Sequence, residues 1–181
     1  MYQDNFIVFT GGPGSGKTTV INELKKRGYL SSEEVGRRVI HTQVEQGGDA
    51  LPWANKKSFR DLMLKAEVDS YQQNQCEVEW GFFDRGVVDI LGYSNLESIC
   101  LSDQLLNAVS SFQYHQKAFI FPPWESIYTN DSERKQDFIV AVKTYKEMIS
   151  AYIQCGYELL EVPCGTVNER VDFILANLKL G

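Results

Sequence analysis

The sequence has few of the residues that build metal centres and disulfide frameworks. It contains only two histidines, and its four cysteines form no C-x-x-C pair and lie far apart, at Cys76, Cys100, Cys155 and Cys164. This spacing excludes a zinc site of the usual kind. Isolated thiols favour a protein whose cysteines are reduced and mostly buried, and hence a cytoplasmic location.

Long apolar runs and an excess of positive charge are also missing. The N-terminal segment 1–5 has no basic residue, and the apolar run Phe6-Ile7-Val8-Phe9 is too short to cross a membrane, so we expect neither a signal peptide nor a membrane span. Lysine and arginine number 18 against 24 acidic residues, for a formal net charge of −6. This balance gives no reason to expect nucleic acid as a partner. We expect the few cations to gather where phosphates bind.

The residues that are present predict one α/β domain. A chain of 181 residues, 43% of them apolar, fits a single globular domain over 1–181. Strands are expected at about 5–10, 29–30, 79–84, 118–121 and 158–162. Helices are expected at about 18–27, 33–45 and 59–74, once or twice within 87–110, at 136–155 and from 166 onward. This alternation is typical of a parallel sheet of about five strands with helices on both faces, a three-layer α/β/α sandwich.

Three helix starts carry a capping pattern, in which a hydroxyl residue is followed three positions later by an acidic one. The pairs are Ser31 with Glu34, Ser58 with Asp61, and Thr166 with Glu169. Each predicts that the hydroxyl caps the helix that follows it.

The most specific pattern is the segment 11–18, a complete G-x-x-x-x-G-K-[ST] phosphate-binding loop. It follows an expected strand and opens an expected helix, which is the context that the motif requires. Its backbone N–H groups and the helix N-terminus would face the β- and γ-phosphates, while Lys17 would reach their oxygens and Thr18 would hold Mg²⁺. The nucleotide site is therefore expected at Gly11, Gly12, Pro13, Gly14, Ser15, Gly16, Lys17, Thr18 and Thr19.

Asp84 is the second candidate for chemistry. It ends an expected apolar strand, so it would project toward the phosphates as a Walker-B-type carboxylate does. There it would hold Mg²⁺ through water or accept a proton from an acceptor hydroxyl; the structural alternative is a helix N-cap for residues from 86 onward. Arg85 is either a phosphate clamp or part of a surface ion pair.

Two further groups have both a functional and a structural interpretation. Arg134, in the charged segment 131–135, would either neutralise charge over the γ-phosphate or belong to a solvent-exposed run of charged residues. Cations at the start of a helix oppose the helix dipole, which favours the first interpretation. Glu34 and Arg37 share one helix face and would bind a polar acceptor, although the capping pattern alone also accounts for Glu34.

Other patterns are weak. Asn55-Lys56-Lys57-Ser58 lacks the aspartate of a guanine-reading N-K-x-D, and Asp89-Ile90-Leu91-Gly92 matches a short D-x-x-G but follows no strand directly. Trp53, Trp124 and Tyr128 would stack on a ring of the ligand or, as the simpler interpretation, pack against other residues.

Several segments occur in a characteristic order along nearly the whole chain. They are the phosphate-binding loop after Phe6–Thr10, Glu34–Arg37, Pro52–Trp53, Phe82–Gly86, Phe121–Trp124, Asp131–Arg134 and Gly156–Pro163. In this arrangement the sequence resembles the small single-domain AAA-type predicted ATPases related to the kinase domain of the NAD-biosynthesis regulator NadR.

The resemblance implies a P-loop fold of the nucleoside- and nucleotide-kinase type that binds ATP and Mg²⁺, with a lid around 129–136. Carried over by position, Asp84 would be the strand-end carboxylate, Arg134 the lid arginine, and Glu34 with Arg37 the acceptor-side pair. The chain is too short for the helical lid domain of ring-forming AAA machines, so a hexameric motor is not expected.

Together these observations predict an ATP·Mg²⁺-dependent phosphotransferase acting on a small hydroxyl-bearing molecule, such as a nucleoside or a related metabolite. Its catalytic residues would be Lys17, Asp84 and Arg134, and Arg85 would join Glu34 and Arg37 on the substrate. The alternative is a regulatory protein whose slow ATP or GTP hydrolysis changes a surface for a protein partner. A fold that binds no nucleotide conflicts with the intact phosphate-binding loop.

Overall fold

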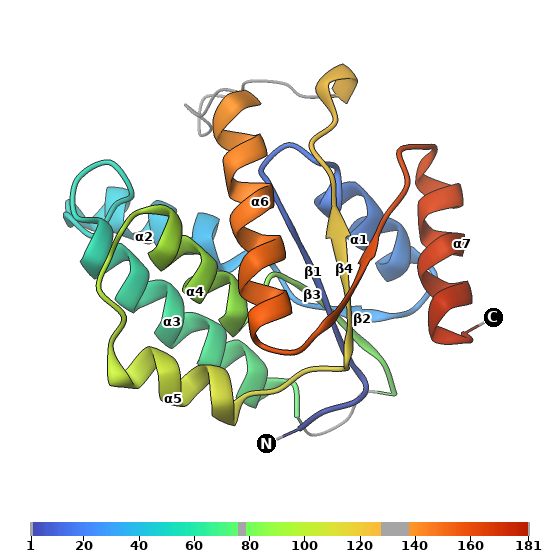
Figure 1. Cartoon of the computed structure of the whole chain (residues 1–181), viewed down its shortest axis with the longest axis horizontal. Helices are drawn as coiled ribbons and strands as arrows, with labels where there is room; N and C mark the ends of the chain where they lie inside the picture. Colours follow the sequence, from blue (N-terminus) through green and yellow to red (C-terminus); the bar gives the residue numbers. More distant parts are fainter. Residues whose placement is uncertain (1, 76–78, 128–137, 181) are drawn as a thin grey trace.

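The sheet is five-stranded and entirely parallel, as the sequence predicts. The computed structural model describes residues 2–75, 79–127 and 138–180. The strands are β1 (Phe6–Gly11), β2 (Leu30–Ser31), β3 (Gly81–Asp84), β4 (Lys117–Phe121) and β5 (Glu158–Glu161), in the order β2-β3-β1-β4-β5. The strand β1 therefore lies at the centre, and the phosphate-binding loop starts from its carboxyl end (Figure 1).

Helices cover both faces of this sheet, which confirms the three-layer α/β/α architecture. On one face lie α1 (Lys17–Lys26) and α7 (Val167–Leu178), and on the other lie the remaining α-helices (Figure 1). These are α2 (Val35–Gln46), α3 (Lys56–Gln73), α4 (Val87–Leu96), α5 (Asp103–Ser111) and α6 (Phe138–Gln154). The segment 87–110 thus holds parts of two helices. A short 3₁₀ turn, η1 (Glu125–Ile127), follows β4.

Alternation along β1 divides the apolar side chains between two cores. Phe6 and Val8 join the core under α2 to α6, while Ile7 and Phe9 join the core under α1 and α7. Successive strand residues point to opposite faces, and both faces here are covered, so the strand has to be apolar throughout. The apolar runs in the sequence therefore predict the strands well.

Two of the three capping predictions are wrong, and one is confirmed. Ser31 pairs with Phe82 in the sheet, and Glu34, which precedes α2, makes no capping bond because its carboxylate binds Arg37 instead. At α3 the cap is Asn55, whose side chain accepts the backbone N–H of Ser58 at 3.1 Å. Ser58 and its expected partner Asp61 therefore lie inside the helix.

At α7 the predicted reciprocal box is present. The Thr166 hydroxyl accepts the backbone N–H of Glu169 at 3.3 Å, and the Glu169 carboxylate accepts the backbone N–H of Thr166 at 2.8 Å. Both donors are otherwise without intrahelical partners, so this box fixes where α7 begins.

Two glycines let the phosphate-binding loop lie close to its neighbours. Gly11 has φ of +122°, and a Cβ there would lie 2.4 Å from the carbonyl oxygen of Phe121 in β4. A Cβ on Gly12 would lie 2.5 Å from the carbonyl oxygen of Ala141 in α6. The loop is therefore packed directly against the backbones of β4 and α6.

The cysteines of the described residues are free, but the prediction that they are mostly buried is wrong. Cys100 and Cys164 are exposed, Cys155 is partly buried, and Cys76 lies outside the described residues. The sequence showed that the cysteines are far apart but not how exposed they are, because the three described ones lie at or beyond the ends of helices and strands.

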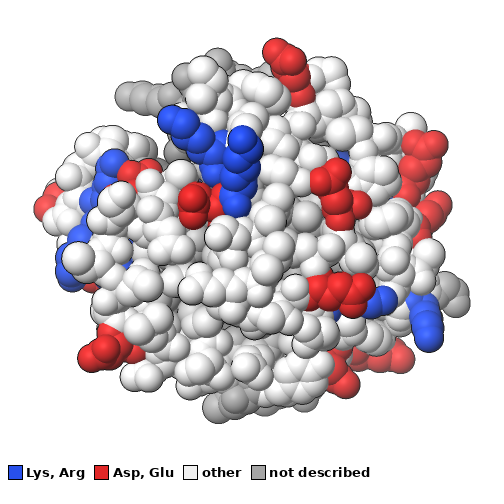
Figure 2. Space-filling model, in the orientation of Figure 1, with Lys and Arg blue, Asp and Glu red and all other residues white. Residues whose placement is uncertain are grey.

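The surface carries mixed charge. On the face seen in Figure 2, acidic side chains are spread widely, while basic ones form only small separate groups. Among the residues that the structure describes, no helix has the length and apolar character needed to cross a membrane.

The cap of α3 supplies a stability test. We expect Asn55→Ala to lower the free energy of unfolding by about 1 kcal/mol, because the Ser58 N–H loses its acceptor. Ser58→Ala should change it by less than ~0.5 kcal/mol, since its hydroxyl does not cap the helix. Urea denaturation of both variants measures the difference, and equal losses would contradict the assignment of Asn55 as the cap.

Candidate functional site

The phosphate-binding loop presents an uncompensated positive helix end. Gly16, at φ +81°, precedes α1 without any side-chain cap, and the first turn of α1 contains no acidic residue. The N–H groups of this turn are therefore left for another acceptor, and the helix dipole adds positive potential at the same point. This arrangement suits a phosphate group.

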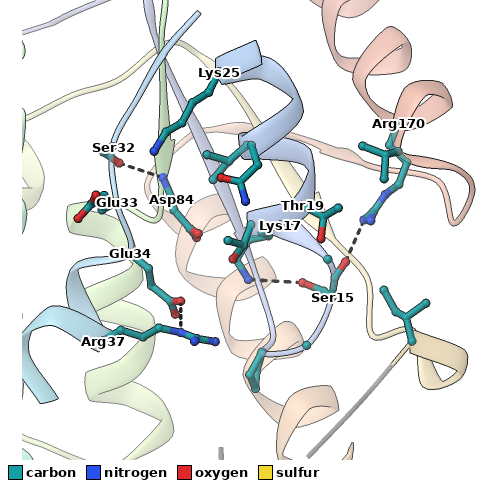
Figure 3. A pocket seen from close by; sticks show the side chains of 18 of the residues that line it. Ser15, Lys17, Thr19, Lys25, Ser32, Glu33, Glu34, Arg37, Asp84 and Arg170 are labelled. Atoms are coloured by element: carbon teal, nitrogen blue, oxygen red, sulfur yellow. Dashed lines mark hydrogen bonds and ion pairs between the residues drawn. The ribbon is translucent and has the colours of Figure 1, made fainter. Parts of the chain in front are cut away.

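Lys17 lies inside the loop rather than in solvent. Its Nζ donates to the backbone carbonyl of Gly12 at 3.0 Å and to the Ser15 hydroxyl at 3.4 Å (Figure 3). Burial, with a smaller contribution from the charge of Arg85, lowers the pKa of Lys17 from 10.5 to about 8. The ammonium group is thus held among loop atoms, and an anion within reach would stabilise its charged form.

Asp84 ends β3 and lies beside the phosphate-binding loop, as predicted (Figure 3). Its backbone N–H donates to the Ser32 hydroxyl at 3.1 Å, but its buried Oδ1 has no hydrogen-bond partner among the described residues. Burial raises the pKa of Asp84, and the nearby charge of Lys17 opposes this rise. A buried carboxylate oxygen without a partner needs one, so Asp84 is suited to bind a ligand.

The alternative interpretation of Asp84 as a helix cap is wrong. The helix α4 starts after Gly86, whose N–H is accepted at 2.9 Å by the carboxylate of Asp89. Asp84 therefore does not cap α4, and its oxygen remains directed at the site.

Arg85, Glu34 and Arg37 form one charged group next to Asp84. Glu34 accepts a hydrogen bond from Arg37 at 2.8 Å, and its other oxygen lies 3.8 Å from Nε of Arg85. Arg85 is only 18% exposed, so the prediction of a surface ion pair does not describe it. Burial alone would lower the pKa of Arg85, but the carboxylates of Asp89, Glu34 and Asp84 raise it, and the guanidinium stays charged.

These residues, except Arg85, line a single cavity of about 1070 Å³. Its walls come from the phosphate-binding loop, the start of α2, the end of β3, η1 and the first turn of α7 (Figure 3). The basic residues that line it are Lys17, Lys25, Arg37, Arg38 and Arg170. In an acidic protein, such a gathering of cations makes the cavity suited to phosphate groups.

Arg170 is the functional candidate that the sequence analysis missed. It belongs to α7, is 3% exposed, and donates from Nη2 to the backbone carbonyl of Ser15 at 3.0 Å. Its guanidinium carbon lies 4.8 Å from the centre of the Phe121 ring and 5.5 Å from that of Trp124. Within the described part of the chain it forms no salt bridge, so its charge is available to the loop.

A signal for Arg170 was present in the sequence. A cation in the first turn of a helix opposes the dipole, which is the same argument that drew attention to Arg134. The distance of 155 residues between Ser15 and Arg170 hid their contact, because only the fold brings α7 against the loop.

The remaining predicted residues divide into two groups. Trp124 lines the cavity, whereas Trp53 is 60% exposed and is not among the residues that line it. Arg134, Tyr128 and the expected lid at 129–136 lie outside the described residues.

Thr18 and Asp84 are the side chains that could hold Mg²⁺. Both line the cavity, both offer oxygen, and Asp84 has a buried oxygen without a partner. Among the described residues no cluster of three or more metal-binding side chains occurs. Mg²⁺ is commonly bound by one or two protein oxygens together with phosphates and water, so this sparse set fits it.

Comparison with known proteins gives the family and the fold. Residues 6–170 match the family model AAA_28, described as an AAA domain. No curated protein matches the sequence at the significance required.

Several solved structures have a similar fold. One is deoxyadenosine kinase from M. mycoides, solved with the products dCMP and a flexible dCDP bound. Its TM-score is 0.66 and its sequence identity 16%, and the match covers 96% of this chain and 98% of that one. Thymidylate kinase from Candida albicans has a TM-score of 0.64, 10% identity, and coverage of 98% and 92%. Shikimate kinase from Aquifex aeolicus has a TM-score of 0.56, 19% identity, and coverage of 96% and 96%. These likenesses show a P-loop kinase fold over nearly the whole chain.

The lowered pKa of Lys17 leads to a pH test. As pH rises through about 8, the free protein loses the charge of Lys17, so MgATP binding must be accompanied by proton uptake and should weaken. We expect the affinity to fall steadily from pH 7 to pH 9.5 in isothermal titration calorimetry. Lys17→Met should bind more weakly, with no such fall; a flat profile for the unaltered protein would contradict the assignment.

Arg170 gives a second binding test. Arg170→Met removes a buried positive charge that is held at the Ser15 carbonyl of the loop, and we expect MgATP to bind about 10-fold more weakly, because one cation fewer attracts the phosphates. The matched control is Arg27→Met, which removes an exposed arginine that joins α1 to Asp172 of α7 without touching the loop. Equal affinities for the two variants in the same titration would remove Arg170 from the site.

Proposed function

Because the chain belongs to the AAA-domain family AAA_28, whose model matches residues 6–170, we propose that it is a P-loop enzyme transferring the γ-phosphoryl group of ATP to a hydroxyl group of a small acceptor. The whole chain would act as one domain in the cytoplasm, with the segment 129–136 as its lid. Within the family we place it near the kinase domain of NadR, on the resemblance stated above.

One observation carries this proposal. The cavity combines a phosphate-binding half, built around Lys17, with a second half that contains the Glu34–Arg37 pair, and Asp84 lies between them. Hydrolysis of ATP needs only water beside the first half. A paired carboxylate and guanidinium in the second half suit a polar organic acceptor.

The residues divide the work as follows. Lys17 and the N–H groups of the loop orient the β- and γ-phosphates and stabilise the charge that develops on them. The acceptor hydroxyl attacks the γ-phosphorus, the bond from that phosphorus to the bridging oxygen breaks, and ADP leaves with the electron pair. The hydroxyl proton passes to the carboxylate of Asp84, whose free oxygen lies buried at this point.

Mg²⁺, when bound at Thr18 and Asp84, would neutralise part of the phosphate charge. Thr18 follows Lys17 directly, so one loop would hold both the metal and the phosphates. Arg134 would supply a further positive charge from the lid.

The nucleobase of ATP would lie at the other end of the cavity. Trp124, Ile127 and Val167 line it there, with the backbone of Gly165 and the guanidinium of Arg170 nearby. An aromatic and aliphatic wall of this kind buries a flat ring and its apolar faces.

A nucleoside is the acceptor class that we propose. Glu34 would accept hydrogen bonds from the hydroxyl groups of the ribose or from amino groups of the base. Arg37 and Arg85 would contact oxygen atoms of the acceptor. One of the structures of similar fold supports this choice, since it is named deoxyadenosine kinase and deoxyadenosine is a nucleoside.

The direct test is incubation of the purified protein with γ-³²P-labelled ATP, Mg²⁺ and a panel of nucleosides, nucleoside monophosphates and hydroxylated metabolites. We expect one class to become labelled, with a matching rise in ADP. ADP formation that no acceptor accelerates, with no labelled product, would overturn the proposal in favour of a hydrolase or a regulatory nucleotide-binding protein.

Variants separate the two halves of the site. Asp84→Asn should lower turnover by about 10²–10⁴-fold, the usual contribution of a positioned base. Glu34→Gln should mainly raise the KM of the acceptor. The control is Glu97→Gln, which removes a carboxylate that pairs with Lys56; neither residue lines the cavity, so both constants should stay unchanged.

A further inference from the structure

Asp89 is a buried charged residue that the proposed reaction does not use. It begins the weak D-x-x-G pattern of the sequence, lies in the first turn of α4, and is 2% exposed. Gly92, at the end of that pattern, packs against Met148 of α6, because a Cβ there would lie 2.8 Å from the methionine sulphur. The pattern therefore belongs to the contact between α4 and α6 and to the interior beneath the site.

The carboxylate of Asp89 accepts four hydrogen bonds from three parts of the chain. Its Oδ1 accepts the Thr10 hydroxyl of β1 at 2.6 Å and Nη1 of Arg85 at 3.1 Å. Its Oδ2 accepts the Tyr152 hydroxyl of α6 at 2.6 Å and the Gly86 N–H at 2.9 Å. A carboxylate satisfied on both oxygens by short bonds has one position and one orientation.

This carboxylate does more than cap α4, because a cap needs only the Gly86 N–H. Two of its partners, Thr10 and Tyr152, come from the central strand and from α6, and they hold the carboxylate from outside its own helix. The fourth partner is the guanidinium of Arg85. Asp89 therefore ties Arg85, which lies beside the cavity-lining Glu34, to β1 and α6.

Arg85 needs such support. Its backbone is in the left-handed region, with φ of +78°, which a residue with a side chain rarely adopts. Its backbone N–H donates to the Phe9 carbonyl at 2.9 Å, and its guanidinium lies between Asp89 and Glu34. The backbone bond alone leaves the side chain free to rotate, so the ion pair with Asp89 fixes the guanidinium.

The other acidic groups near Arg85 do not replace Asp89. Glu34 lies 3.8 Å from Nε, beyond hydrogen-bond distance, and is shared with Arg37. Glu67 of α3 is also buried nearby, but burial, with the charge of Asp89, raises its pKa well above the usual range and disfavours its charged form. Asp84 acts on Arg85 through its charge, but among the described residues no salt bridge joins the two. Asp89 is therefore the principal counter-ion of Arg85.

We propose that Asp89 is a positioning residue for the acceptor half of the site: it holds the guanidinium of Arg85 beside Glu34, and Thr10 and Tyr152 hold Asp89 in turn. The effect on turnover rests on the proposed function. The effect on Arg85 does not, so the two can be tested separately.

The first measurement follows the Arg85 side chain itself. In ¹H–¹⁵N spectra of the ¹⁵N-labelled protein, the Nη–Hη signals of Arg85, assigned by their loss in Arg85→Lys, report how fast the protons on the nitrogen that donates to Asp89 exchange with water. We expect Asp89→Asn to accelerate this exchange about 10- to 100-fold, as loss of a charged hydrogen-bond partner predicts. An unchanged exchange rate in Asp89→Asn would overturn the inference, whatever the activity of the protein.

Milder variants keep the test valid if Asp89→Asn does not fold. Tyr152→Phe and Thr10→Val each remove one hydroxyl donor to Asp89 without changing the shape of the side chain, and each should accelerate the exchange about 2- to 10-fold. The matched control is Tyr71→Phe. It removes a hydroxyl from another fully buried tyrosine, whose donor bond goes to the Gln113 carbonyl, and it should leave the Arg85 signal unchanged.

The second measurement is a double-mutant cycle that follows the turnover of MgATP. The acceptor identified by the labelling panel is included, and if the panel identifies none, the hydrolysis of MgATP is measured. Asp89→Asn should lower kcat about 10-fold while the MgATP dissociation constant changes less than about 2-fold, and it should have no further effect in an Arg85→Met background. An equal loss in both backgrounds would show that Asp89 acts through general stability and would overturn the inference. Faster exchange at Arg85 combined with a protein that labels no acceptor would sustain the positioning role and reject the proposed function.

Discussion

The exposed positive end of α1 is the constraint on which the rest of the site depends. No side chain caps this helix and no acidic residue lies in its first turn, so several N–H groups and the dipole point into the cavity together. Lys17 and Arg170 add two buried cations at the same loop. The loop carbonyls of Gly12 and Ser15 accept hydrogen bonds from these two cations, and the carboxylate of Asp84 also stabilises the charge of Lys17. The backbone carbonyls of the loop therefore help to hold both cations at the loop.

The parallel sheet turns this local feature into a two-sided site. Because β1 and β3 are neighbours and run in the same direction, the loop after Gly11 and the carboxylate of Asp84 reach the same edge of the sheet. The chain after β2 brings Glu34 and Arg37 to that edge from α2. The same topology places Asp89, in the first turn of α4, where β1, α4 and α6 meet. The acceptor half is thus built from residues that are separate in sequence and joined by the order of the strands.

Sequence patterns predicted the parts of this molecule that depend on local physics. The strands are buried on both faces, so continuous apolar runs identified them, and the phosphate-binding loop requires specific residues at fixed positions. The capping patterns at Ser31 and Ser58 failed because a serine three residues before an acid is also compatible with a strand end or a helix interior. Asp89 and Arg170 were missed or discounted since their roles exist only when distant segments meet. Thr10 lies 79 residues from Asp89, and Ser15 lies 155 from Arg170.

Gly12 shows how packing narrows a motif that chemistry leaves open. In G-x-x-x-x-G-K-[ST] the second position is variable, because the phosphates place no demand on its side chain. In this chain a Cβ on Gly12 would lie only 2.5 Å from the carbonyl oxygen of Ala141 in α6, so even alanine would force α6 and the loop apart. The freedom that the motif permits at this position is removed by the helix behind it. A substitution at Gly12 would displace α6, and a change in the packing of α6 would displace the loop through the same contact.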